Sequence, residues 1–199
     1  MISQAALDAA KAAYDIEAAC INEMKEYFDD EQFAKAVELL AEQLGGEIFP
    51  IHRLDQNVGG VMIYARHKKA AAELSAIISR QEMVKEYVAL VHGIPPESGD
   101  WQDLLFKDSR RNKVFVVDRQ RTGVKKARLE FMRLRADTES LVRIRLHTGR
   151  SHQIRVQFAS RGFPLVGDHK YGSRDSATAP MLFSCRLTFP HGGKMCSFE

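Results

Sequence analysis

The chain has 199 residues, which is enough for one domain with a hydrophobic core. Its share of hydrophobic residues is 45%, and no apolar run approaches the roughly 20 residues of a membrane-spanning helix. The N-terminus lacks the pattern of a signal peptide, and the three cysteines show no Cys-x-x-Cys spacing, which argues against disulfides and a zinc site. We therefore expect a cytoplasmic protein that binds no metal.

Charge is distributed unevenly along the chain. Residues 1–44 hold 10 acidic and 3 basic residues, whereas residues 45–199 hold 16 acidic and 26 basic ones. A basic body suggests a polyanionic partner, although lysines and arginines that simply solvate a surface remain an alternative. The densest basic stretch comprises Lys107, Arg110, Arg111, Lys113, Arg119, Arg121, Lys125, Lys126 and Arg128. These residues are candidates for phosphate contacts, and a solvated hairpin is equally compatible with them.

Residues 1–44 contain neither Gly nor Pro. Apolar residues recur at helical spacing between about residues 4 and 28, which predicts one amphipathic helix. A second helix is predicted after Asp29 and Asp30, and Gly45-Gly46 would end it. We expect residues 1–44 to form a helical appendage, similar to the N-terminal helices of sugar-isomerase (SIS) domains, and residues 45–199 to form the main domain.

Residues 45–199 alternate between short apolar runs and Gly or Pro turns, which is typical of strands with interspersed short helices. We predict strands at residues 48–51, 61–66, 84–92, 114–117, 127–134, 140–147 and 181–189, and helices at residues 68–80 and 152–160. Together these elements predict an α+β fold.

One loop has the features of a catalytic site. His52-Arg53-Leu54-Asp55 stands just before Gly59-Gly60 and an apolar strand, so that a rigid element would hold the carboxylate. A neighbouring arginine keeps a partly buried aspartate ionised, which is the state that a nucleophilic carboxylate requires.

Three other sites are possible from residue types alone. Ser151, His152 and Asp168 could form a hydrolase triad, but adjacent Ser and His point different ways and no Gly-x-Ser-x-Gly turn is present. His52, His67 and Asp55 lack a recognised metal-ligand spacing. The pairs Gly45-Gly46 and Gly59-Gly60 are too sparse for a phosphate-binding loop. We consider all three weaker than the Asp55 loop.

Four motifs resemble the RluA-type pseudouridine synthases in order and spacing. They are His52-Arg-Leu-Asp55, Lys85-Glu-Tyr87-Val-Ala-Leu-Val-His-Gly93, Thr148-Gly-Arg-Ser-His-Gln-Ile-Arg155, and Gly-Phe-Pro-Leu-Val-Gly167-Asp-His-Lys-Tyr171-Gly172. The resemblance covers about residues 45–198. It implies a mixed, mainly antiparallel sheet flanked by helices, and an isomerase that converts uridine to pseudouridine in ribosomal or transfer RNA without a cofactor.

The resemblance also implies roles for individual residues. Asp55 would be the catalytic aspartate, Tyr87 would stack on the flipped base and help remove its C5 proton, and Arg155 would pair with the catalytic carboxylate. Substrate contacts would come from Arg53, Arg150 and His152. The chemistry agrees, because breaking a glycosidic bond builds positive charge on the sugar that a close carboxylate stabilises or captures.

The chain also departs from this family. Members usually have a strand ending in Lys-Pro ahead of the catalytic loop, and residues 1–44 show none. We therefore expect either an uncovered sheet edge or one covered by the N-terminal helices. The missing strand motivates an alternative, a catalytically impaired relative that only binds RNA. The target RNA, the modified position and the oligomeric state remain open.

Overall fold

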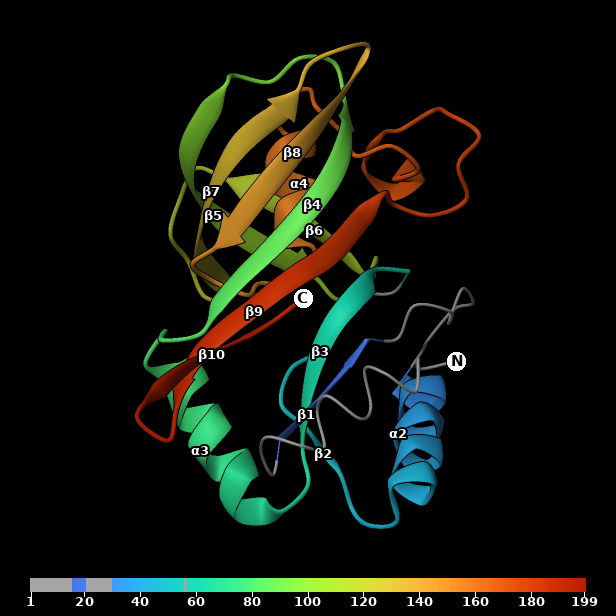
Figure 1. The fold of residues 1–199 in the computed structure, drawn as a ribbon. Coiled ribbons are helices and arrows are strands. Elements are labelled where there is room, and N and C mark those ends of the chain that lie inside the picture. Colours follow the sequence, from blue (N-terminus) through green and yellow to red (C-terminus); the bar gives the residue numbers. More distant parts are fainter. Residues whose placement is uncertain (1–15, 21–29, 56) are drawn as a thin grey trace. The chain divides into compact units, whose positions relative to one another are not determined.

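The computed structural model describes residues 16–20, 30–55 and 57–199 (Figure 1). These residues form two compact units. The first holds the described residues up to Met83 together with Ser184–Glu199, and the second holds Val84–Phe183. The chain therefore leaves the first unit after Met83 and returns to it at its C-terminal end.

Strand β3 (Gly59–Ala65) lies at the centre of the first unit. It pairs with β1 (Ile16–Cys20), β2 (Phe49–Pro50) and β9 (Leu182–His191), and β9 pairs in turn with β10 (Lys194–Phe198). Successive side chains of a strand point to opposite faces. Val61, Ile63 and Ala65 accordingly join a cluster with helix α3 (Lys68–Ser79), whereas Met62 and Tyr64 join one with helix α2 (Asp30–Leu44). Both faces of β3 are therefore buried.

The prediction of one helix over residues 4–28 is wrong for Ile16–Cys20, which forms strand β1; the rest of that span lies outside the described residues. Strand β1 runs antiparallel to β3, in a register from Ile16↔Ala65 to Cys20↔Val61. Although Ala has the highest intrinsic helix propensity, hydrogen bonding of the whole segment to the edge of β3 outweighs it. The expectation that residues 1–44 contribute no strand to the sheet is therefore also wrong.

The second predicted helix is confirmed as α2. Leu40 is buried, and Val37, Ala41 and Leu44 pack against the same cluster. The helix ends before Gly45, whose φ of 70° lies in the left-handed region, and the Gly46 N–H donates to the Ala41 carbonyl.

The second unit is an antiparallel sheet with strand order β4-β8-β7-β5-β6. Its strands are β4 (Val84–His92), β5 (Ser98–Asp108), β6 (Lys113–Val117), β7 (Val124–Arg135) and β8 (Glu139–Leu146). Helix α4 (Gln153–Ala159) packs on one face, where Phe158 meets the rings of Trp101 and Phe131. A short 3-10 helix, η1 (His169–Tyr171), follows. The predicted α+β fold with a mainly antiparallel sheet is confirmed.

Strand β5 was missed by the sequence analysis. Its first residues, Ser-Gly-Asp, have poor strand propensity, and exposed residues alternate with half-buried ones. The strand forms because it pairs with β7 from Ser98↔Met132 to Phe106↔Val124 and with β6 on its other side. Long-range pairing, rather than local preference, decides this element.

Candidate active site

The Asp55 loop connects β2 to β3 in the first unit. The His52 Nε2 atom accepts a hydrogen bond of 3.3 Å from the Ile63 N–H, and Leu54 packs against the α2 cluster. The Asp55 carbonyl accepts from the Val58 N–H at 3.0 Å, which closes a tight turn directly after the aspartate. Asp55 itself is half-buried and Arg53 is exposed. The backbone that carries the carboxylate is therefore tied to β3.

The glycine that follows this loop is required by close packing between β3 and β9. Gly60 has a φ of 119°, and a Cβ atom there would lie 2.2 Å from the Ser184 carbonyl oxygen. The Ser184 hydroxyl in turn donates to the Val61 carbonyl at 3.2 Å. Only glycine allows this approach of the two backbones, and it places the end of the Asp55 loop against β9.

Tyr87 lies on β4 in the second unit, opposite Ile144 of β8, and is buried. Lys85 stands two residues before it and so faces the same side of the strand. The Lys85 Nζ atom is 3.2 Å from where a Cβ of Gly149 would lie, and burial lowers the pKa of Lys85. The sequence analysis did not single out Lys85, although its position in the Lys-x-Tyr motif could have drawn attention to it.

The turn before α4 is organised by Gln153, another residue that the sequence analysis missed. Its Oε1 atom accepts from the Thr148 hydroxyl at 2.8 Å and from the Arg150 N–H at 3.0 Å. Its Nε2 atom donates to the Arg128 carbonyl on β7 at 3.0 Å. The exposed Arg150 side chain donates to the Lys126 carbonyl at 2.9 Å. The turn and strand β7 are therefore held together as one piece.

Arg155 forms a buried bidentate ion pair with Asp168. The Nε to Oδ2 distance is 2.7 Å and the Nη2 to Oδ1 distance is 2.8 Å, and the two side chains are 7% and 1% exposed. Fork-to-fork geometry of this kind fixes the orientation of a guanidinium. Within the second unit, Asp168 is thus the carboxylate partner of Arg155. From the sequence alone, the only role indicated for Asp168 is that of a member of a hydrolase triad.

The structure does not form that triad. Both carboxylate oxygens of Asp168 bind Arg155, and the His152 Nδ1 atom lies 2.8 Å from the Tyr171 hydroxyl instead. A different Ser-His-Asp group joins His92, Ser173 and Asp175, but its serine and aspartate both contact the same imidazole nitrogen, Nε2. In a catalytic triad the serine and the aspartate contact different ring nitrogens of the histidine, so this group does not have triad geometry. Among the described residues, no group of three or more His, Cys, Asp or Glu could hold a metal ion.

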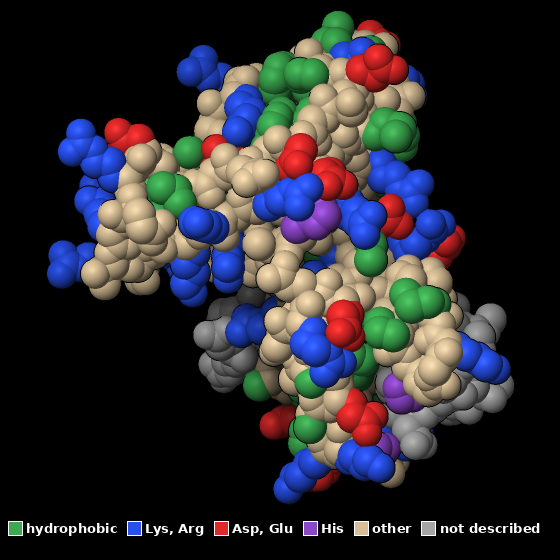
Figure 2. Space-filling view, turned by 90° about the vertical axis from the view of Figure 1, so that its left-hand side faces the viewer, with side chains coloured by type: hydrophobic (Ala, Val, Ile, Leu, Met, Phe, Trp, Pro, Cys, Tyr) green, Lys and Arg blue, Asp and Glu red, His purple; other side chains and the backbone are tan. Residues whose placement is uncertain are grey.

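The basic stretch predicted to contact phosphates lies on strands β5, β6 and β7 and their loops. Figure 2 shows Lys and Arg side chains projecting along the left-hand margin of the view. Seven of the nine residues are exposed, and Lys113 and Arg128 are half-buried. Exposed cationic tips of this kind can contact a phosphate backbone.

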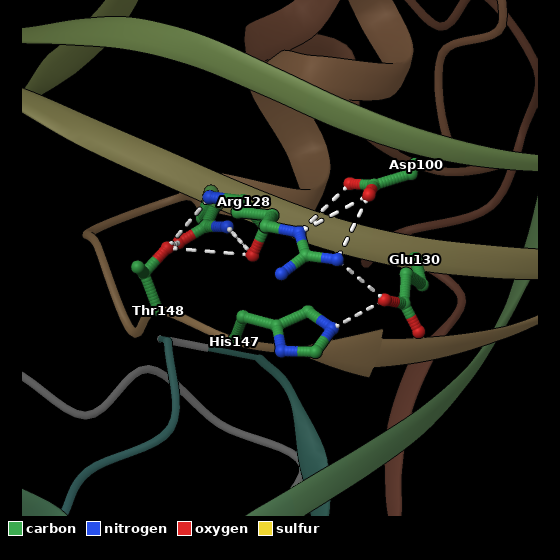
Figure 3. A network of polar contacts seen from close by, with 6 residues as sticks. Asp100, Arg128, Glu130, His147 and Thr148 are labelled. Carbon is green, nitrogen blue, oxygen red and sulfur yellow. Dashed lines mark hydrogen bonds and ion pairs between the residues drawn. The ribbon is translucent and has the colours of Figure 1, made fainter. Parts of the chain in front are cut away.

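Arg128 differs from the other residues of the stretch because two carboxylates balance its charge (Figure 3). Its Nη2 atom lies 2.8 Å from Asp100 Oδ2 and 2.8 Å from Glu130 Oε1, and the His147 Nε2 atom lies 2.9 Å from the same Glu130 oxygen. The hydrogen bond from Arg128 lowers the pKa of Asp100 and, reciprocally, raises that of Arg128. Arg128 is therefore the least suited of the nine to bind phosphate.

The sequence profile of the RNA pseudouridylate synthase family matches residues 17–160. The chain is 39% identical over 137 residues to an uncharacterized RNA pseudouridine synthase of Chloroflexus aurantiacus, covering 67% of this chain and 42% of that relative. It is 36% identical over 125 residues to the ribosomal large subunit pseudouridine synthase D of Pseudomonas aeruginosa, covering 62% and 38%. A tRNA pseudouridine synthase C of Vibrio vulnificus is 26% identical over 187 residues, covering 84% and 76%.

Among solved structures, the human RNA Pseudouridylate Synthase Domain Containing 4 superposes with a TM-score of 0.78 at 20% identity, covering 97% of this chain and 90% of that one. This likeness supports the fold. The chain belongs to the RNA pseudouridylate synthase family, and the resemblance to RluA-type members is confirmed. The chain spans about two fifths of the length of the first two curated relatives. No helix among the described residues is long and apolar enough to cross a membrane.

Proposed function

We propose that this protein isomerises uridine to pseudouridine in RNA. One observation carries the proposal: the family profile spans residues 17–160, and this stretch holds Asp55, Tyr87 and Arg155, each within its motif. A protein that only binds RNA has no need of all three. The alternative, a catalytically impaired relative, was motivated by a missing strand. Strand β1 pairs with β3, which removes that motivation.

Each residue has a task in the proposed reaction. Cleavage of the glycosidic bond builds positive charge on the sugar, and the Asp55 carboxylate would capture it at C1′ or assist loss of the 2′ proton. The detached uracil must stay bound while it rotates, and the ring of Tyr87 would stack on it and help remove the C5 proton. Arg155 would pair with the Asp55 carboxylate, while its two hydrogen bonds to Asp168 fix the orientation of the guanidinium.

The RNA would be held by cations and by donors on the turn before α4. Arg53, Arg150 and His152 are our candidates for direct contacts, and the exposed members of the basic stretch are candidates for phosphates farther along the strand. Ribosomal or transfer RNA is the substrate class that fits the names of the relatives. We further propose a cytoplasmic location and no cofactor.

The test is conversion of uridine to pseudouridine in total RNA from cells that lack the protein. Wild type and Asp55→Ala are compared, with Asp137→Ala as the matched control, because Asp137 is an exposed aspartate in the turn between β7 and β8. We expect product from wild type and Asp137→Ala and none from Asp55→Ala. A folded wild-type protein that binds RNA and forms no product would refute the proposal and favour the impaired relative.

A further inference from the structure

One histidine of the second unit contacts a carbonyl oxygen with each of its two ring nitrogens. His169 is the first residue of η1, and it is exposed to solvent. Its Nδ1 atom lies 3.1 Å from the Ser173 carbonyl oxygen, and its Nε2 atom lies 2.8 Å from the Ala177 carbonyl oxygen. We call these two contacts the His169 clamp, because they tie the segment after η1 to the ring at two points.

The two acceptors define the protonation state of the ring. A carbonyl oxygen has lone pairs and no proton to donate, so each ring nitrogen must supply the proton of its own hydrogen bond. Neutral imidazole has one N–H group, whereas the imidazolium ion has two. In the neutral ring, one nitrogen lone pair would face a carbonyl oxygen. Only protonated His169 forms both hydrogen bonds of the clamp.

The surroundings of His169 also favour the protonated ring. The hydrogen bonds to the two carbonyls are the largest cause of its raised pKa and outweigh the lowering by burial, and the charges of Asp168 and Asp175 raise it further. Each of these carboxylates has another partner, since Arg155 of α4 binds Asp168 and His92 of β4 lies 2.8 Å from Asp175. The other ionisable side chains between residues 167 and 180 are Lys170, Tyr171 and Arg174.

The segment that His169 binds also holds the backbone around Asp168. The Ser173 N–H donates to the Asp168 carbonyl at 3.1 Å, and Ser173 is buried. The Asp175 carboxylate accepts from the Gly167 N–H at 2.9 Å. Gly167 and Asp168 are therefore fixed by the same segment whose carbonyls His169 binds.

Asp168 carries this constraint to Arg155, because both of its carboxylate oxygens bind that guanidinium. Resting on the proposed function, we propose that His169 is a positioning residue whose protonated ring holds residues 173–177 against Asp168, and that loss of the proton releases one of the two carbonyls. His169 does not touch the RNA. It acts through Asp168 on the orientation of Arg155.

The proposal predicts the direction of a pH dependence. Histidine in an unfolded chain titrates at about 6.5, and the pKa of His169 in the folded protein is raised above that value. The clamp is therefore complete below about pH 6.5 and is lost as the pH rises through the folded-state pKa. Asp168 and Arg155 should then be held less firmly in mildly alkaline solution.

Two measurements on the full chain test the proposal. The first uses protein with ¹⁵N-labelled histidine, because the shifts of the two ring nitrogens report whether each carries a proton, and His169→Gln identifies the signal. The second is kcat/KM of pseudouridine formation from about pH 6 to about pH 9 in wild type, His169→Gln and His169→Arg. Gln has no charge to lose, and Arg stays charged throughout. His191→Gln is the matched control, since His191 ends β9 in the first unit.

We expect both ring nitrogens of His169 to carry a proton at about pH 6. At that pH, His169→Gln should lower kcat/KM about 10-fold, as for loss of a hydrogen bond to a charged group. At about pH 9 the loss should shrink to less than about 2-fold, because wild type has then lost the same charge. His169→Arg should gain on wild type as the pH rises, and His191→Gln should keep the wild-type profile.

Three results would overturn the proposal: an unprotonated ring nitrogen at about pH 6, wild-type activity in His169→Gln at that pH, or an equal loss in this variant at every pH, which is what a merely structural role gives. Absence of product from wild type would refute the proposed function and with it the effect on Arg155. The ring-nitrogen measurement separates the two failures, because it detects the clamp without any activity.

Discussion

The buried pair of Arg155 and Asp168 gives the sharpest prediction for stability. Asp168→Asn keeps the shape of the side chain and removes its charge, so the Arg155 guanidinium is left in a site that is only 7% exposed. Loss of the Asp168 charge weakens both charge-assisted hydrogen bonds that Arg155 donates to this side chain, and a site with so little exposure lets little water replace them. Breaking a buried pair by removing one partner costs about 3–5 kcal/mol, and we expect a loss of that size here.

Two further aspartates in the same unit provide a graded comparison. Asp103 pairs with Arg161 through two hydrogen bonds of 2.9 and 3.1 Å, and the two side chains are 12% and 29% exposed. Asp100 pairs with Arg128, and these side chains are 43% and 41% exposed. Water compensates a lost partner more fully as exposure rises. The cost of Asp→Asn should therefore decrease from Asp168 to Asp103 to Asp100.

The assay is urea unfolding of wild type and the three single variants, followed by circular dichroism, with the slope of the transition checked for constancy. All three pairs are bidentate Arg–Asp contacts that differ in burial, and Arg128 also keeps its contact with Glu130 when Asp100 is replaced, which lowers the expected cost there further. A loss in Asp168→Asn that is no larger than in Asp100→Asn would refute the expected order.

Two other changes test backbone packing and charge burial. Gly60→Ala places a methyl group 2.2 Å from the Ser184 carbonyl oxygen, so we expect thermal unfolding to show a loss of stability of more than about 2 kcal/mol. Gly45 also has a positive φ but has open space around it, so Gly45→Ala should cost less stability. Burial lowers the pKa of Lys85 in the folded state, so the charged side chain destabilises the fold at pH values below that pKa. This destabilisation disappears above about pH 10.4, where lysine in the unfolded chain also loses its proton. Lys85→Met should therefore be more stable than wild type at pH 7, and a difference that persists undiminished in unfolding at pH 11 would contradict this.

Several elements could be predicted from local pattern. The alternation in residues 84–92 coincides with β4, and the predicted strand over residues 140–147 differs from β8 by one residue at each end. The helix predicted over residues 68–80 is α3, shorter by one residue. In each case one face of the element is buried, so the spacing of apolar residues carries the signal.

Segments that depend on a distant partner could not be predicted. Ile16–Cys20 lies in an Ala-rich stretch with helical spacing, and it is a strand because β3 supplies its hydrogen-bond partners. Strand β5 likewise depends on β7 and β6. Local propensity differs by less than about 1 kcal/mol per residue between helix and strand, so pairing of a whole segment overrides it.

The sequence by itself determined the family, the α+β class and the motif residues Asp55, Tyr87 and Arg155, because motif spacing and apolar periodicity are written along the chain. Only the tertiary structure decided which side chains meet. Asp168 was assigned to no role beyond a doubtful triad, yet it holds Arg155, and Tyr171 reaches His152 and Val114 across 19 and 57 positions of sequence. Such contacts form only when folding buries charged groups and hydrogen-bond donors next to one another, and no local sequence pattern specifies that geometry.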